Sequence, residues 1–482
     1  MARKLQSHAA APLWSRLPHE LRYMVFEYLS SDESINAGET SQRLSDYAAI
    51  CKEWQKFFEK ETFRHLRLHQ DDLENFERIV HSDRRDLVNH LWLRLELRNY
   101  DCNQCNERES DAEDREHNLL LTSAIWKLFR IMSPWTSCTK REALLTLELS
   151  AHSPSDSEHH FKELEARIDD TAYSSGIRGR KLQPRDDPQH HWVSAGRILN
   201  IPESTKERVT GSIQGLRFDR RASCARVLQS LPEVHVVDVL MIRRQFYRAF
   251  SVKDCLIPVI KALPQVRQIK YEPWRGVSTA HREKRDEQYK ALFEFIGRSN
   301  RCQYLFLFED FSDILNYSVH TTASRNSELG KVLARSTRDL KSINVAFAVD
   351  AIDFFDEFSA GQKATQDLRW RNLRTIALTS KLLNERSFGM VIHAAGRAAL
   401  RMPKLQFMEL WHVERGKACV FRYVISGEGY ATVRVVRIFG PGLRLSTSIH
   451  GDICRSGITL WMVEASIITA TSFTTYAWHF NL

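Results

Sequence analysis

The chain has 482 residues, of which 43% are hydrophobic and 27% are charged. This balance supports a folded core and excludes wholesale disorder. No apolar run reaches the roughly 18 residues that a membrane-spanning helix needs, and the start, MARKLQSHAAAPLWSRLP, lacks the apolar core of a signal peptide.

Cysteine usage and charge narrow the class of protein further. The nine cysteines are scattered, which suits a reducing interior, so we expect a protein of the cytoplasm, the nucleus or both, with no membrane partner. The net charge of +9 resides in residues 369–482, which hold 15 Lys/Arg against 6 Asp/Glu. A basic quarter steers acidic partners, although a solvated surface with a local bias is the plainer explanation. Its arginines are dispersed, which disfavours nucleic acid as a partner.

The first predicted element is a helix that begins at Leu17-Pro18-His19-Glu20, because proline suits the first helical position and Glu20 suits the positive first turn. One apolar stripe follows at helical spacing: Leu21, Met24, Val25, Tyr28 and Leu29. Leu17, Tyr23 and Phe26 fall largely outside that stripe. A helix that is apolar on two faces needs two partners, one in its own small domain and one in another protein.

A second helix is expected over residues 44–58, with one apolar side formed by Leu44, Tyr47, Ala48, Cys51, Trp54 and Phe58. The segment LP-x-E-LRYMVFEY-L followed by YAAICKEWQKFF resembles the F-box, the three-helix module that docks onto a Skp-type adaptor of cullin–RING ubiquitin ligases. The resemblance covers roughly residues 14–60, and SSDESINAGETSQR at 30–43 is a longer linker than most members carry. We assign residues 12–62 to an F-box-like helical module.

Each candidate side chain in this module has a structural and a functional interpretation. We expect Leu21, Met24, Ile50 and Trp54 to form the module's core, and Leu17, Pro18, Val25, Phe26 and Leu29 to offer an adaptor surface. The adaptor-binding set that the resemblance implies is Leu17, Pro18, Leu21, Val25, Phe26, Leu29, Ile50 and Trp54.

Residues 63–439 form the body of the chain and carry one recurring hexamer with apolar residues at positions one, four and six. It occurs as FRHLRL, VNHLWL, LLTLEL, VHVVDV, VRQIKY, CQYLFL, LKSINV, LRTIAL, LQFMEL and VRVVRI. The alternating half predicts a short strand, and helical patterns lie between, for instance at 286–296 and 387–400. Two polar stretches, near 101–118 and 151–193, are interpreted as exposed insertions.

Strand–helix units at a near-constant period indicate a solenoid, and the pattern resembles an irregular leucine-rich repeat. We therefore predict a mixed α/β chain: a helical F-box-like module followed by a leucine-rich-repeat-like solenoid. An ordinary α/β domain with a parallel sheet is the alternative. Residues 440–482 are nearly free of acids and break the repeat, so they are either capping strands or a tail.

Sequence motifs for catalysis and ligand binding are missing. Cys102 and Cys105 form a C-x-x-C without a second pair at zinc-finger spacing. There is no GxxxxGK[ST], GxSxG or HExxH sequence. We therefore expect no catalytic residue, metal or cofactor.

The whole layout is similar to that of F-box proteins of filamentous fungi, which implies a substrate-recruiting subunit of a Skp–cullin–RING ubiquitin ligase. Its partners would be the Skp-type adaptor and an unidentified protein substrate. Target-binding residues are unknown, and the first candidates on the strand-rich face are His235, Lys270, Asn344, Arg374 and Glu409. Two alternatives remain: a repeat-based interaction protein with no ligase role, and an α/β enzyme with its site at the strand ends.

Overall fold

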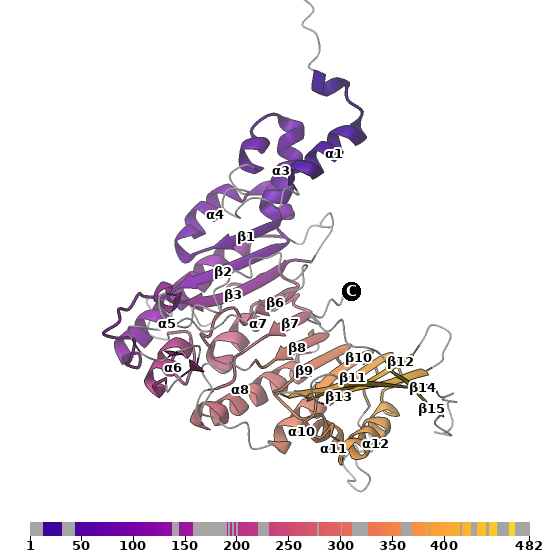
Figure 1. The fold of residues 1–482 in the computed structure, drawn as a ribbon. Coiled ribbons are helices and arrows are strands. Elements are labelled where there is room, and N and C mark those ends of the chain that lie inside the picture. Colours follow the sequence, from indigo (N-terminus) through magenta and orange to yellow (C-terminus); the bar gives the residue numbers. More distant parts are fainter. Residues whose placement is uncertain are drawn as a thin grey trace, which may run out of the picture.

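A computed structural model describes most of the chain and combines helices and strands in a mixed α/β fold (Figure 1). The described residues are 13–30, 44–136, 144–157, 190, 193–194, 197–198, 201–219, 231–276, 279–299, 301–310, 326–357, 369–384, 386–414, 417–425, 431–439, 443–450 and 462–467. For 193–194, 197–198 and the last two ranges only the backbone is described.

One open sheet of 13 strands runs through the molecule, with β1 and β15 as its edge strands. Its strands are β1 (His65–Leu68), β2 (His90–Glu96), β3 (Thr146–His152), β6 (Val239–Ile242), β7 (Gln268–Tyr271), β8 (Tyr304–Phe308), β9 (Ser342–Ala346), β10 (Thr375–Thr379), β11 (Phe407–Glu414), β12 (Lys417–Ile425), β13 (Ala431–Phe439), β14 (Leu443–His450) and β15 (Met462–Ile467). A separate two-stranded sheet pairs β4 (Val193–Ser194) with β5 (Arg197–Ile198).

The strand order follows the chain order throughout the large sheet. From β1 to β11 every pairing is parallel, and each strand is added beside its predecessor. From β11 to β15 the pairings are antiparallel. Among the described strands there is thus no reversal of order, the feature at which doubly wound α/β sheets bind their ligands.

The helices lie along one side of the parallel strands (Figure 1). The helices of the body are α4 (Leu73–Ile79), α5 (Asp111–Met132), α6 (Glu203–Thr210), α7 (Ile257–Lys261), α8 (Thr279–Arg298), α10 (Ser327–Ser336), α11 (Ala351–Asp356) and α12 (Phe388–Ala399). One hydrophobic cluster contains buried residues of both layers, from Leu91 in β2 to Leu410 in β11.

Side-chain periodicity explains how the strands and the helices bury their apolar residues against one another. In β7, Ile269 and Tyr271 are buried while Gln268 and Lys270 between them remain partly exposed, as period-two alternation requires. In α12, the buried residues are Val391, Ala394, Ala395 and Ala398, which is the i, i+3, i+4, i+7 pattern of one helix face. Each unit therefore buries one strand face and one helix face against the other.

The recurring hexamer predicts most of the parallel strands correctly. Strands β7 to β11 begin at residues 268, 304, 342, 375 and 407, each two residues into its hexamer. The hexamer VHVVDV is an exception, because Val234, Val236 and Val237 lie in and around a turn and β6 begins only at Val239, its last residue. VRVVRI lies in β13, which is antiparallel, and its partner β12 was not among the predicted strands.

The interpretation of residues 101–118 as an exposed insertion is wrong in its second half. Helix α5 begins at Asp111, with Ser110 as its N-cap and Glu113 completing a capping box. His117 and Asn118 are buried, and Asn118 accepts a hydrogen bond from the Arg217 backbone N–H at 2.9 Å. Polar side chains that find internal partners can be buried, which composition alone does not reveal.

The second predicted insertion, 151–193, also begins too early. Ala151 and His152 are the buried last residues of β3, and a 3-10 turn spans Pro154–Ser157. Residues 158–189 lie outside the described residues. In the predicted tail or cap at 440–482, the described backbone forms β14 and β15, which extend the sheet.

The N-terminal helices are α1 (His19–Ser30) and α3 (Lys52–Arg64). Residues 44–58 were expected to form one helix, but 44–48 are helical, 49–50 form a turn, and α3 starts after Cys51, whose backbone is extended. Helix α3 continues to Arg64 and runs directly into β1. The expected module boundary at 62–63 therefore falls inside a helix.

Candidate functional site

The N-terminal helices pack through an aromatic cluster centred on Phe26. Its ring lies 5.1 Å from that of Trp54, 4.9 Å from Phe57 and 5.5 Å from both Phe58 and Trp14. Phe26 is 2% exposed. Offset and edge-on aromatic contacts at these distances stabilise a core beyond the area that they bury.

A charged contact holds the same face of α1 against α3. Arg22, four residues before Phe26, forms a salt bridge with Glu53 of α3, and the Trp14 indole N–H donates to the other Glu53 oxygen at 3.2 Å. Arg22 and Phe26 are one helical turn apart, so they lie on one face. This face meets α3.

A second face of α1 carries an exposed apolar stripe. Its members are Leu17, Leu21, Met24, Val25 and Tyr28, all classed as exposed. Met24 is 62% exposed and Tyr28 is 77% exposed. The stripe repeats at helical spacing and is displaced by one residue, about 100° around the helix, from the Arg22–Phe26 face. We call these five residues the apolar stripe.

The structure reverses part of the predicted division between core and surface. Leu17, Pro18 and Val25 are exposed as expected, and Leu29 and Trp54 are partly buried. Phe26, expected at the surface, is the buried centre of the module. Leu21, Met24 and Ile50, expected in the core, are exposed. The prediction failed because α1 has two apolar faces, and α3 packs on the face that presents Phe26 to its aromatic residues.

The helix break at residues 49–51 accounts for the exposure of Ile50. Ala49 and Ile50 donate backbone hydrogen bonds to the carbonyls of Asp46 and Tyr47, which closes a turn before α3 begins. Ile50 therefore lies at a corner and is 57% exposed. In an unbroken helix it would share a face with Trp54.

Buried ionic networks surround two glutamates, one inside β3 and one directly after β8. Glu148 in β3 accepts hydrogen bonds from His90 at 2.8 Å and Arg243 at 2.6 Å. Burial alone would raise the pKa of Glu148, but His90 and Arg243 outweigh it and hold the pKa below its ordinary value. Glu309 after β8 accepts from Arg275 and Arg285, each at 2.8 Å, and from the Tyr289 hydroxyl at 3.1 Å.

A third network fixes the segment before α5. Glu109 pairs with Arg248 at 2.7 Å and with His117 at 3.1 Å. Burial acts to raise the pKa of Glu109, and the contacts with Arg248 and His117 lower it to about 2. Asp156 accepts a hydrogen bond from the Tyr100 hydroxyl at 2.8 Å, and burial raises its pKa. Buried charges that are paired in this way hold loops in one arrangement.

The five candidate target-binding residues do not form one group. Lys270 and Asn344 are partly exposed on the sheet face opposite the helices. Glu409 lies in the same row but is buried, with Arg422 at 2.6 Å, so its expected exposure is wrong. His235 lies in the turn before β6 and pairs with Glu233 at 3.3 Å, and Arg374 precedes β10.

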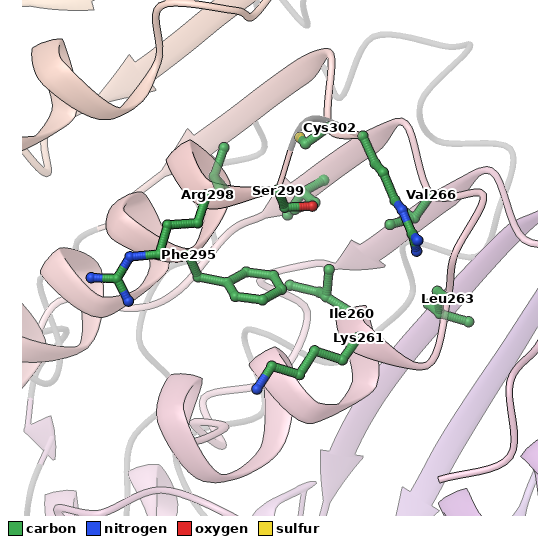
Figure 2. A pocket seen from close by; sticks show the side chains of 11 residues that line it. Ile260, Lys261, Leu263, Val266, Phe295, Arg298, Ser299 and Cys302 are labelled. Carbon is green, nitrogen blue, oxygen red and sulfur yellow. The ribbon is translucent and has the colours of Figure 1, made fainter. Parts of the chain in front are cut away.

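A cavity of about 360 Å³ lies near the amino ends of β7 and β8 (Figure 2). Apolar side chains, including Ile260, Leu263 and Phe295, form its floor, and Lys261 and Arg298 stand at its mouth. Both cations occupy the last turn of a helix, where the helix dipole favours them. The residues that line this cavity include no carboxylate and no imidazole.

Burial disfavours the thiolate form of three cysteines in the described part of the chain. Burial raises the pKa of Cys302, which lines the cavity, to about 12. Burial also raises the pKa of Cys255 and Cys419. Cys105 is buried and its thiol donates to the Cys102 carbonyl at 3.1 Å. No cluster of three or more potential metal ligands occurs in the described part of the chain.

Comparison with known protein families places part of the chain. A family model described as "Family of unknown function (DUF6546)" matches residues 298–441. No curated protein matches the chain. The matched stretch runs from the end of α8 to just beyond β13, so it contains four parallel strands and the first antiparallel pairings. The N-terminal helices lie outside it. None of the described helices combines the length and apolarity needed to cross a bilayer.

Proposed function

We propose that this protein is the target-recruiting subunit of a Skp–cullin–RING ubiquitin ligase. In this proposal, residues 12–62 are an F-box-like module that binds the Skp-type adaptor, and the body is a leucine-rich-repeat-like solenoid that binds a protein target. The observation that carries the proposal is the apolar stripe, which stays exposed although another face of α1 is already packed against α3.

The stripe has the composition of a docking surface. Four exposed apolar side chains on α1, together with Leu17 just before the helix, are more than the scattered exposed apolar residues of an ordinary surface. Burying one such side chain contributes about 1.5–3 kcal/mol before the costs of association. A few residues of this kind suffice for a specific interface. The resemblance of the LP-x-E segment to the F-box supplies the identity of the partner, a Skp-type adaptor.

The sheet supports the solenoid part of the proposal. Nine parallel strands stand in chain order, and those from β7 to β11 begin 32 to 38 residues apart. In a solenoid each unit contacts mainly its neighbours, and that is how α8, α10, α11 and α12 succeed one another along the sheet (Figure 1). The units are longer than ordinary leucine-rich repeats and are irregular near β3.

The mechanism that follows is tethering. The module fixes the chain to the ligase while the body holds a target, so that the target's lysines reach a high effective concentration at the ubiquitin-carrying enzyme. The protein itself then needs no catalytic group. The buried networks around Glu148 and Glu309 have a structural role in this account, because their charged atoms are paired inside the protein.

Co-purification with a Skp-type adaptor tests the proposal. We expect the full chain to retain purified adaptor, and Leu21→Asp/Met24→Asp to lose at least about 100-fold in affinity, because two carboxylates would be buried at the contact. Met390→Asp is the matched control, since Met390 lies on α12 and is 52% exposed. Equal retention by the double variant would refute the role of the stripe.

The same experiment separates the alternatives. A chain that folds but never retains the adaptor is the repeat-based interaction protein without a ligase role. An enzyme would require a pocket with convergent acids or histidines, whereas the cavity of Figure 2 is lined by apolar and cationic side chains.

A further inference from the structure

The sheet face opposite the helices is covered over β2 and β3 and open farther along. The loop after β6 folds back over this face. The Arg243 guanidinium lies 5.3 Å from the Trp92 ring centre, and Phe246 stacks on His152 at 4.6 Å. Trp92 and His152 are accordingly buried. From β7 to β13 many outward side chains remain partly exposed, although Ser342, Thr379 and Glu409 are buried, and we call this region the open face.

The backbone register places one row of side chains across the open face. It runs from β7 to β13 through Lys270, Phe306, Asn344, Ala377, Glu409, Arg422 and Arg434. Partly exposed aromatic side chains flank this row, namely Tyr304, Phe308, Phe407 and Trp411. Aromatic residues that are half-buried on a rigid sheet are typical anchors of protein interfaces.

Among the described residues of this face, the carboxylates are paired with arginines. Its two carboxylates, Glu272 and Glu409, are buried, with Arg244 at 3.8 Å and Arg422 at 2.6 Å as their respective partners. Asp310, at the edge, pairs with Arg244 at 3.0 Å. Lys270 and Arg434 have no carboxylate within salt-bridge distance in the described part of the chain. Two cations thus remain for an external acid.

The spacing of these two cations indicates the shape of the ligand. Lys270 on β7 and Arg434 on β13 are six strand spacings apart, which corresponds to about 29 Å across the sheet at about 4.8 Å per strand. An extended peptide of about nine residues covers that distance. A nucleic acid carries a phosphate at every nucleotide and requires clustered cations, so two cations this far apart fit a peptide better.

We propose that the open face binds an extended acidic peptide segment of the target, which crosses the strands from β7 to β13. One carboxylate pairs with Lys270, another pairs with Arg434, and apolar side chains between them contact the aromatic residues around Phe306. This inference deepens the proposed function, because it names the chemistry of the target.

The environment of Lys270 agrees with such a pairing. Burial lowers the pKa of its amine, and Glu272 only partly opposes this effect. A carboxylate brought to the amine would compensate for its lost hydration. The basic bias of the C-terminal quarter contributes here as well, since Arg422 and Arg434 both belong to it.

Selection from a random 12-residue peptide library on the immobilised full chain tests the proposal. We expect the enriched peptides to carry at least two Asp or Glu residues separated by several positions with apolar residues between them. In fluorescence anisotropy, such a labelled peptide should bind Lys270→Glu and Arg434→Glu at least about 10-fold more weakly than the wild type. Arg397→Glu should bind like the wild type, because Arg397 is an exposed residue of α12 in the same basic quarter.

Three results would overturn the inference: enrichment of neutral or basic peptides, unchanged binding by both charge-reversal variants, or tighter binding of a 12-nucleotide oligothymidylate than of the acidic peptide. Lys270→Gln and Arg434→Gln provide milder variants if charge reversal impairs folding. The outcome is independent of adaptor retention. Peptide binding without adaptor retention rejects the ligase role alone, and adaptor retention without peptide binding rejects the open face alone.

Discussion

Replacing Phe26 by alanine should detach α1 from α3. Phe26 and Phe58 are the buried residues of these two helices, and Phe26 contacts the rings of Trp14, Trp54 and Phe57. Truncation of a buried phenylalanine to alanine costs about 3–5 kcal/mol. A helix of 12 residues is marginal on its own, so this loss exceeds what the remaining contacts of α1 can offset.

Hydrogen exchange followed by mass spectrometry resolves this loss locally. We expect Phe26→Ala to remove the protection of the amides in 19–30 while leaving β7 to β11 unchanged. The matched control is Met24→Ala, because Met24 is on the exposed side of the same helix and should change stability by less than about 0.5 kcal/mol. Full protection of 19–30 in Phe26→Ala, or its loss in Met24→Ala, would show that the two faces of α1 are wrongly assigned.

Three further predictions concern the body of the chain. Gly330→Ala should lower the free energy of unfolding by about 1–3 kcal/mol, because a Cβ there would stand 2.8 Å from the backbone of α11. Gly396→Ala should raise the free energy of unfolding by about 0.5–1 kcal/mol, because the added Cβ would meet nothing within 4 Å. Urea unfolding measures both changes, and a change of the same sign in the two variants would contradict the packing of α10 on α11. Glu309→Gln should cost about 3 kcal/mol in the same assay, because Glu309 is fully buried and its loss takes a carboxylate from two partly buried arginines, Arg275 and Arg285. Glu116→Gln, in an exposed pair, should cost less than about 1 kcal/mol, and a comparable loss in both variants would count against the buried network. Burial first, and then the charge of a neighbouring arginine, lowers the pKa of His152 from 6.5 to about 3. The folded state therefore favours neutral His152, so stability present above pH 6.5 is lost as the pH falls toward 3, with about 2 kcal/mol lost between pH 7 and 5. His152→Gln should lack this loss, and identical slopes for the wild type and the variant would contradict the assigned burial.

The strands of the body could be predicted because the hexamer combines two independent burial signals. In VRQIKY, Val266 is buried ahead of the strand, and Ile269 and Tyr271 are buried within it. Where a segment shows only one of these two burial signals, the predicted strand is misplaced or missed. In VHVVDV, Val234, Val236 and Val237 are buried before the strand, which begins only at Val239. Strand β12 has apolar residues on both faces, so no alternation marked it as a strand.

Buried polar residues are a second reason why part of the fold could not be predicted from the sequence. The start of α5 has the composition of a loop, because its buried side chains include His117 and Asn118. Their partners, Glu109 and Arg217, are supplied by the fold. The capping box of Ser110 and Glu113 is the signal that could have located this helix.

The division of α1 into core and surface shows a third limit. Its two apolar stripes are about 100° apart, and both satisfy helical periodicity. Only the position of α3, with Trp54 and Phe58, decides that Phe26 points inward and Met24 outward. Sequence could therefore locate a two-faced helix but could not assign its faces.

The dissociation constant between the purified full chain and a purified Skp-type adaptor, measured by isothermal titration calorimetry, tests the central claim most directly. The account predicts a 1:1 complex with a dissociation constant below about 1 µM, abolished by Leu21→Asp/Met24→Asp and retained by Met390→Asp. An absence of measurable heat with folded protein, or equal affinity for the wild type and the double variant, would contradict it.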